Sequence, residues 1–363
     1  MIVIDAHLDL SWNALGWNRD LRQSVAEIRA SEAGLPQKGR GTNTVAFPEM
    51  RSGKVGICLA TVLARSKPRG ATSIDFRNQE IAFAVAQGQL AYYRVLEEQG
   101  AIRFIRNAAE LSASFAEWKS SPATAPFGFV LAMEGADPIV NPAQVERWRR
   151  DGLRVVGLTH YGASPYGHGT GSDGPLTPAG VELLNAMADA GMILDLTHLA
   201  DESFWQALKL WKGPVLASHN NCRALVPGGR QFSDDQIRAI IERHGVIGAA
   251  FDAWMLAPDW TLSMEPKVQI KAVVDHMDHI CQLAGNARHI AIGSDLDGGY
   301  GTEQTPAGLD TIADLQKIAL LNGAAVGAGF DIALAADVRY AAEPARVSVA
   351  MAKIGLTGTD MGI

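Results

Sequence analysis

Eight short apolar runs recur along the chain, and a longer segment separates each run from the next. Several of these segments have apolar residues at helical spacing, as in 76–99, or begin at residues that commonly cap helices, namely Thr177, Asp201 and Ser233. Strands that alternate with helices pair in parallel through right-handed crossovers. The eight expected strands are residues 2–9, 55–63, 127–134, 153–160, 191–198, 214–219, 245–251 and 289–295.

Eight strand–helix units predict an α/β fold of the (β/α)8 TIM-barrel type. An open, doubly wound sheet is the alternative, but no glycine-rich phosphate loop follows the first strand. Two long loops, 10–54 and 161–176, are expected as insertions. The second is rich in Gly, Ser, Pro and Tyr and could fold over a site.

Residues that bind metals or transfer protons stand at the ends of the expected strands. The first apolar run leads into Asp5-Ala6-His7-Leu8-Asp9, where alternation places His7 and Asp9 on one face of a strand. Later strands end in Glu134, His160, His198, His219 and Asp295. In a barrel these ends converge on one face. Structural groups at strand ends can look the same, but so many polar groups together indicate a bound cation.

The expected donor set exceeds what one metal needs. A tetrahedral zinc ion takes four ligands, whereas this face offers at least three histidines and two or three carboxylates. Such a set suits two metal ions that share a carboxylate. Two cations about 3.5–4 Å apart can hold a bridging hydroxide at neutral pH and polarise a carbonyl group.

Composition argues against some partners and locations. The formal net charge of −7 disfavours nucleic acid or an anionic membrane surface as the main partner. No apolar run approaches the roughly 20 residues that span a bilayer, and no signal peptide is expected before the first strand. The three cysteines lie far apart, as is typical of free thiols in a reducing compartment. We therefore expect a cytoplasmic protein.

Six motifs in order resemble those of the membrane (renal-type) dipeptidases and their bacterial relatives. They are DAHLDL, AMEGADPI, GLTHYGASPYG, GMILDLTHLAD, ASHNNCRAL and IGSDLDGG, and the resemblance covers about residues 2–317. It implies a metal-dependent (β/α)8 hydrolase barrel over residues 1–319. It also implies two Zn²⁺ ions per chain and, for the family, a homodimer.

The resemblance assigns the metal ligands by position. His7 and Asp9 would bind one zinc ion, and His198 and His219 would bind the other. Glu134 would bridge both ions and so take part in catalysis.

The resemblance also assigns the residues that meet the substrate. His160 would bind it near the scissile carbonyl and help to stabilise the oxyanion. Arg230 would pair with the C-terminal carboxylate of the substrate. Asp295 would be the catalytic group that takes a proton from the bridging water and passes it to the leaving amine. Tyr161 and Tyr166 are candidates for the pocket lining.

The implied reaction is hydrolysis of small dipeptides, with tolerance for a D-residue at the C-terminal side. The mammalian relatives are secreted and lipid-anchored, and this location is not carried over because we expect neither signal in this chain. Two alternatives stay open. One is a related metal-dependent amidohydrolase that acts on another carboxylate-bearing amide or a lactone, and the other is a catalytically impaired fusion product.

The last 44 residues resemble a different family, the enoyl-CoA hydratase/isomerase (crotonase) group. In that family the segment NGAAVGAG begins a helix, and Ala325 matches the position whose backbone N–H lines the thioester oxyanion hole. The part that would bind most of the coenzyme A is missing. Residues 320–363 are therefore expected to be neither an independent domain nor an active crotonase. We expect an intact metal site in a chain of doubtful stability.

One further cluster of metal-binding residue types is expected to be structural. Asp275, His276, Asp278 and His279 fall within a helical segment before the eighth strand. That segment belongs to the outer ring of a barrel, away from the strand ends.

Overall fold

The computed structural model describes residues 2–67, 69–70 and 72–321 of the 363. Its strands are β1 (Val3–Leu8), β2 (Val55–Val62), β3 (Arg65–Ser66), β4 (Asp75–Phe76), β5 (Ile102–Phe104), β6 (Phe127–Met133), β7 (Leu153–Gly157), β8 (Ile193–Asp195), β9 (Val215–Ala217), β10 (Val246–Ala249) and β11 (Ile290–Ile292). Its α-helices are α1 (Leu10–Gly16), α2 (Val25–Ser31), α3 (Phe47–Ser52), α4 (Gln79–Glu98), α5 (Ala108–Ser120), α6 (Val145–Arg150), α7 (Pro178–Asp189), α8 (Asp201–Leu210), α9 (Asp234–Glu242), α10 (Lys271–Ala284) and α11 (Gln316–Leu321). Three short 3₁₀ helices are η1 (Pro142–Gln144), η2 (Ala253–Met255) and η3 (Ile312–Leu315).

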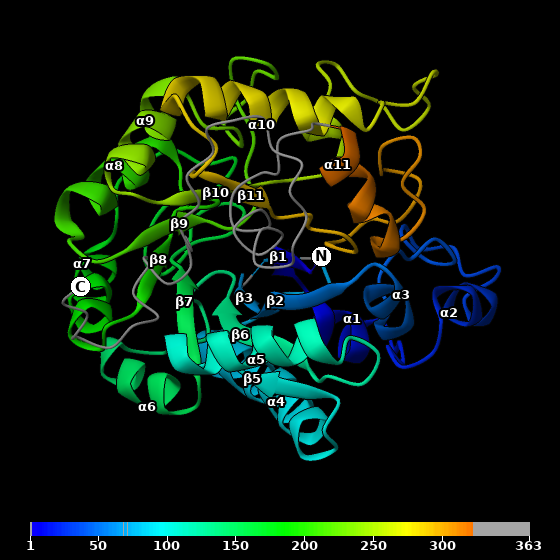
Figure 1. Cartoon of the computed structure of the whole chain (residues 1–363). Helices are drawn as coiled ribbons and strands as arrows, with labels where there is room; N and C mark the ends of the chain where they lie inside the picture. The colour runs from blue at the N-terminus through cyan, green and yellow to red at the C-terminus, as the bar shows by residue number, and fades with distance from the viewer. Residues whose placement is uncertain (1, 68, 71, 322–363) are drawn as a thin grey trace.

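Eight parallel strands close into a barrel. Their order is β1, β2, β6, β7, β8, β9, β10 and β11, and β11 pairs again with β1. All eight strands predicted from the apolar runs are present, so the (β/α)8 prediction is confirmed. The open-sheet alternative is wrong, because the β1–β11 and β2–β6 pairings leave no free edge in the ring. Figure 1 shows helices around the strands, with α10 on one side and α4 and α5 on the opposite side.

The strands differ from the predicted ones mainly at their C-terminal ends. The predicted strand 191–198 is only Ile193–Asp195, and 153–160 is only Leu153–Gly157. Beyond these points the backbone leaves the ladder, and His198 and Asp295 take φ values of +67° and +56°. Such values are uncommon for residues with a Cβ atom and recur at functional sites. A ninth strand, Ile102–Phe104, was not predicted; it pairs with the first half of β6 outside the ring.

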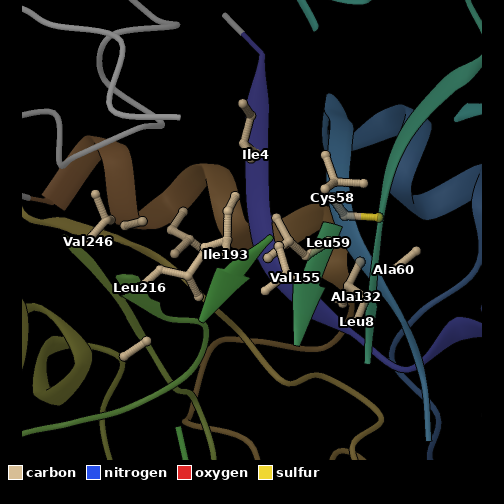
Figure 2. Close-up of a cluster of buried hydrophobic side chains, with 14 of the residues drawn as sticks. Ile4, Leu8, Cys58, Leu59, Ala60, Ala132, Val155, Ile193, Leu216 and Val246 are labelled. Carbon is tan, nitrogen blue, oxygen red and sulfur yellow. The ribbon is translucent and has the colours of Figure 1, made fainter. Parts of the chain in front are cut away.

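The core lies in and around the barrel. Every residue of β2 and of β6 is buried, as expected for parallel strands that helices cover. Figure 2 shows apolar side chains from β1, β2, β6, β7, β8, β9 and β10 gathered in one cluster, among them Leu8, Ala132 and Leu216. This packing fixes the positions from which the polar strand ends project.

Two of the three predicted helix caps are confirmed. The Thr177 side chain accepts from the Gly180 N–H at the start of α7, and Ser233 forms a capping box at the start of α9. The third is wrong: Asp201 is the first residue of α8, and Ala200 occupies the cap position. The Asp201 carboxylate instead accepts two bonds from the Arg223 guanidinium, at 2.7 and 2.8 Å.

The C-terminal segment is described only as far as α11. The crotonase-like stretch from 322, including Ala325, lies outside the described residues, and the domain boundary at residue 319 stays a prediction. Within the part of the chain that is described, no helix combines the length and the apolarity needed to cross a membrane.

The histidines of α10 have structural roles, as predicted. The Cys222 N–H donates to Nδ1 of the buried His276 at 3.0 Å, and Nε2 of His279 lies 2.8 Å from Asp234 Oδ1 on α9. Both contacts tie α10 to neighbouring segments.

His276 is expected to make folding sensitive to acid. Burial lowers its pKa from 6.5 to about 4, so between these values the unfolded chain binds a proton that the folded chain excludes. Lowering the pH from 7 to 5 is therefore expected to cost about 2 kcal/mol of unfolding free energy through this group. Urea unfolding at both pH values checks this result. His276→Gln keeps an acceptor for the Cys222 N–H and should lose less unfolding free energy than the wild type between pH 7 and pH 5. His244→Asn, at an exposed position, should lose as much as the wild type.

Candidate metal centre

One carboxylate oxygen lies at the centre of the converging strand ends. Oε1 of Glu134, just past β6, is 3.2 Å from Nε2 of His198 and 3.3 Å from Nε2 of His219. The same oxygen is 3.5 Å from Nε2 of His160 and 3.6 Å from Nε2 of His7. Four histidines from four different barrel strands thus present the same ring nitrogen to one carboxylate.

A second group adjoins the first. Nε2 of His7 is 3.6 Å from Asp9 Oδ1 and 3.7 Å from Asp295 Oδ1. Each of three sets brings its ligand atoms within 4.8 Å of one another: His7–Glu134–His219, Glu134–His160–His198 and His7–Asp9–Asp295. The structure therefore brings together all the residues that the sequence proposed as metal ligands, and Asp295 and His160 join them.

The charges in this cluster favour a cation. Burial raises the pKa of Asp9 and Asp295, and the negative charge of Glu134 raises both further. Burial would lower the pKa of His7, but Glu134 and Asp9 outweigh it and hold that pKa well above its ordinary value. Crowded carboxylates thus hold a proton on a buried imidazole, and a divalent cation could take the place of that proton.

The histidines at the other end of the cluster are in the form that binds metal. Burial lowers the pKa of His198 and His219 well below the ordinary value, so both rings are neutral. Their Nε2 atoms lie only 3.2 Å apart. Neutral imidazole nitrogens and carboxylate oxygens are the donors that zinc takes in proteins. The buried Nε2 of His7 has no hydrogen-bond partner, as a ligand atom aimed at a metal would have none. The residues present therefore fit a metal centre.

Hydroxyl groups hold the far sides of these rings. Nδ1 of His198 lies 2.9 Å from Thr170 Oγ1, and Nδ1 of His219 lies 2.9 Å from Ser218 Oγ. Thr61 Oγ1 on β2 donates to Asp9 Oδ1. Partners of this kind orient ligands and leave Nε2 free for the metal. Sequence reasoning missed all three, although Ser218 directly precedes His219.

Ser218→Ala is expected to weaken metal binding without unfolding the protein. The hydroxyl lies within 3.3 Å of Nδ1 of both His219 and His7, so its loss frees two ligand rings to rotate. Loss of such a partner typically costs 10–100-fold in metal affinity. Competition with a chromophoric chelator measures the affinity, and Ser112→Ala at an exposed position is the matched control. An unchanged affinity in Ser218→Ala would contradict this role.

A pocket of about 120 Å³ opens above the cluster. Its lining includes Trp12 from loop 10–54 and Tyr161 from loop 161–176, the two loops that were expected to contribute. The prediction that Tyr166 lines the pocket is wrong, because its ring is buried and its hydroxyl donates to the Ile139 carbonyl. The loops after β9 and β10 also line the pocket, and the sequence analysis had not predicted the contribution of the second.

Arg230 lines the pocket, and its guanidinium group has an unused hydrogen-bond donor. It is buried, and one terminal nitrogen donates to the His219 carbonyl at 2.8 Å. The other terminal nitrogen is buried without a hydrogen-bond partner. A buried guanidinium with an unused donor is suited to a carboxylate ligand.

The family model for membrane dipeptidase (peptidase family M19) matches residues 1–321. The chain belongs to the membrane dipeptidase family. This confirms the resemblance read from the six motifs. A second model, enoyl-CoA hydratase/isomerase, matches residues 283–363, which confirms the crotonase-like character of the C-terminal segment.

Curated relatives of this dipeptidase-family chain are moderately similar. Dipeptidase tcpJ of Claviceps purpurea is 31% identical over 174 residues, which are 47% of this chain and 40% of that protein. An uncharacterized protein in the PQQ-III 3′ region of Acinetobacter calcoaceticus is 28% identical over 169 residues, which are 44% of this chain and 53% of that protein. The chain spans about half the length of the curated relatives that it matches.

Solved structures share the fold of this family member. The dipeptidase AC, a metallopeptidase of family M19, superposes with a TM-score of 0.71 at 23% identity, covering 88% of this chain and 91% of that one. A metallopeptidase from Rhodobacter sphaeroides, liganded with a phosphinate mimic of the dipeptide L-Ala-D-Ala, superposes with a TM-score of 0.70 at 22% identity. The superposition covers 98% of this chain and 96% of that one. At these identities the likeness shows the barrel fold.

Proposed function

We propose that this chain hydrolyses dipeptides with two zinc ions bound at the barrel mouth. The observation that carries the proposal is the position of Glu134 Oε1, 3.2–3.6 Å from Nε2 of four histidines beneath a small pocket. His7 and Asp9 would hold one ion and His198 and His219 the other, with Glu134 between them. When bound, the metal pair supplies a water of lowered pKa and polarises the scissile carbonyl.

His160 is suited to bind the substrate carbonyl oxygen. Burial lowers its pKa to about 4, so the ring is neutral at pH 7. Its Nδ1 lies 3.3 Å from an Arg65 nitrogen, which can only donate, so Nδ1 accepts. The ring proton therefore sits on Nε2, on the side of Glu134. That N–H can donate to an oxygen on which negative charge develops.

Asp295 and Arg230 complete the proposed assignment. The Asp295 carboxyl lies beside His7 and lines the pocket. From there it would take a proton from the water that the metal pair activates and pass it to the leaving amine. Burial and the charge of Glu134 raise the pKa of Asp295, which would help the carboxyl to keep a proton taken from that water until it passes to the leaving amine. Arg230 would bind the C-terminal carboxylate through its unused nitrogen. A small pocket and one carboxylate anchor support a dipeptide over a longer peptide.

Tolerance of a D-residue at the C-terminal side is part of the proposal. The support is the family resemblance together with the fold shared with the Rhodobacter sphaeroides protein bound to an L-Ala-D-Ala mimic. We also propose a cytoplasmic location, which the free state of Cys58, Cys222 and Cys281 supports. The homodimer stays a prediction.

Amino-acid release from a panel of dipeptides tests the proposal. L-Ala-L-Ala and L-Ala-D-Ala are compared with N-acetyl-L-alanine and with a simple lactone, using the full chain loaded with zinc. Preferential release from the dipeptides supports the proposal. Cleavage of only the acylated amino acid or the lactone would favour the alternative amidohydrolase. No cleavage by a chain that is unfolded by circular dichroism would favour the impaired fusion product.

A further inference from the structure

A buried carboxylate without a cationic partner lines the substrate pocket. Asp252 follows β10 and is 7% exposed. Its Oδ1 accepts from Gln304 Nε2 at 2.5 Å and its Oδ2 from the Trp254 indole N–H at 2.5 Å. Among the described residues it forms no ion pair; Lys38 acts on its pKa only through space. The Trp254 backbone N–H also donates to Oδ1, at 3.4 Å. Three neutral donors therefore orient the carboxylate and leave acceptor capacity on Oδ2.

An aromatic ring stands beside this carboxylate. Trp254 lines the same pocket, is partly exposed and is fixed by its bond to Asp252. No arginine or lysine of the described chain stacks on it, although Trp17, Trp118 and several other rings carry such partners. A carboxylate next to a partly exposed indole in one pocket is a combination that can bind a cationic group.

The walls of the pocket differ in chemistry, which orients a bound dipeptide. Trp12, Leu63 and Ile74 form an apolar wall beside Asp9, and a second, mainly apolar pocket of about 280 Å³ shares these three residues. Arg230 and Asp252 follow the adjacent strands β9 and β10. Tyr161 lines the same pocket as both of them. A dipeptide whose α-carboxylate is held by Arg230 would therefore have its C-terminal residue in the part of the pocket next to Asp252.

We infer that Asp252 and Trp254 form a subsite for a cationic side chain on the C-terminal residue, so that the preferred substrates are dipeptides ending in lysine or arginine. This inference rests on the proposed function and adds a substrate class to it. Burial raises the pKa of Asp252 to about 6, which leaves the carboxylate ionised at pH 7 and poorly solvated. A substrate ammonium or guanidinium group would replace part of the missing solvation.

Paired substrates of equal size measure the effect of charge. The kcat/KM of the zinc-loaded full chain is compared for Ala-Lys and Ala-norleucine, with the C-terminal residue in each chirality, and for Ala-Glu. The wild type is expected to favour lysine over norleucine by about tenfold. Asp252→Asn should abolish this ratio and raise the kcat/KM for Ala-Glu several-fold. Such a gain cannot come from a misfolded protein. Asp259→Asn, at an exposed position in the same loop, should change neither the lysine-to-norleucine ratio nor the kcat/KM for Ala-Glu.

Other results would overturn the inference. A lysine preference that persists in Asp252→Asn would remove Asp252 from the subsite. If Asp252→Asn lowers kcat/KM equally for all substrates, Asp252 binds the α-ammonium group or supports folding, and it does not bind the substrate side chain. If no dipeptide is cleaved by the folded, zinc-loaded wild type, the proposed function fails. Calorimetry then measures the affinity of the chain for Ala-Lys and Ala-norleucine. Tighter binding of Ala-Lys that is lost in Asp252→Asn supports the subsite, and equal affinity of the wild type for both dipeptides overturns it.

Discussion

Glu134→Gln is expected to abolish zinc binding and dipeptide hydrolysis together. The substitution keeps the shape of the side chain but removes the charge that faces His7, His160, His198 and His219. An amide oxygen is a weak ligand, and it cannot bridge two cations as a carboxylate does. Because even a hydroxyl that only orients a ligand is worth 10–100-fold, loss of the bridging ligand should lower kcat/KM by about 1,000-fold or more.

Two measurements separate this effect from unfolding. Metal content by mass spectrometry should fall from two zinc ions per chain to none. The midpoint of thermal unfolding should rise with zinc in the wild type, because a ligand bound only by the folded state stabilises it, and should not rise in the variant. Glu146→Gln, an exposed position on α6, is the matched control and should behave as the wild type. A Glu134→Gln protein that holds two zinc ions and cleaves dipeptides normally would contradict the assignment.

Asp295→Asn is expected to separate metal binding from catalysis. The amide cannot accept and release a proton, so hydrolysis should fall by about 10²–10⁴-fold, the usual contribution of a positioned acid–base group. Asparagine adopts the φ of +56° found here more readily than most residues, so the strand end should keep its conformation. The zinc content and the zinc-induced rise in the unfolding midpoint should therefore stay close to those of the wild type.

The control for this variant shares its backbone conformation. Asp259 is exposed and has a φ of +54°, so Asp259→Asn makes the same chemical change at the same kind of position outside the site. It should retain full activity. Loss of both zinc ions in Asp295→Asn would show that Asp295 is chiefly a ligand. Undiminished turnover would exclude it as the proton carrier.

The arrangement of the site could be predicted from the sequence because barrel topology brings the C-terminal ends of all the strands to one face. Once β6, β8 and β9 are recognised as parallel strands, Glu134, His198 and His219 must meet at one end of the barrel. The motif order added the assignment of each residue, and the family match bears out the resemblance. The predicted strands extend too far at their C-terminal ends, because the backbone of β8 leaves the ladder after Asp195, before the apolar pattern stops.

Other features depend on contacts that no local pattern reveals. Asp252 is the first charged residue after a predicted strand, yet it carries no motif, and its importance comes from lying in the same pocket as Arg230. Thr61 points at Asp9 only because β1 and β2 are neighbours in the ring. Tyr166 looked like a pocket residue from its loop, but its ring packs in the core because that loop folds back on α7.

We propose that the strand ends of this barrel form a two-metal site that cleaves dipeptides. Titration of the metal-free full chain with zinc, with L-Ala-D-Ala and L-Ala-L-Lys hydrolysis followed at each step, tests it most directly. We expect no hydrolysis without metal, and a rise in the rate of hydrolysis that reaches its plateau at two equivalents of zinc per chain. Full activity in the metal-free protein, or no activity in a folded chain that has bound two equivalents, would contradict it.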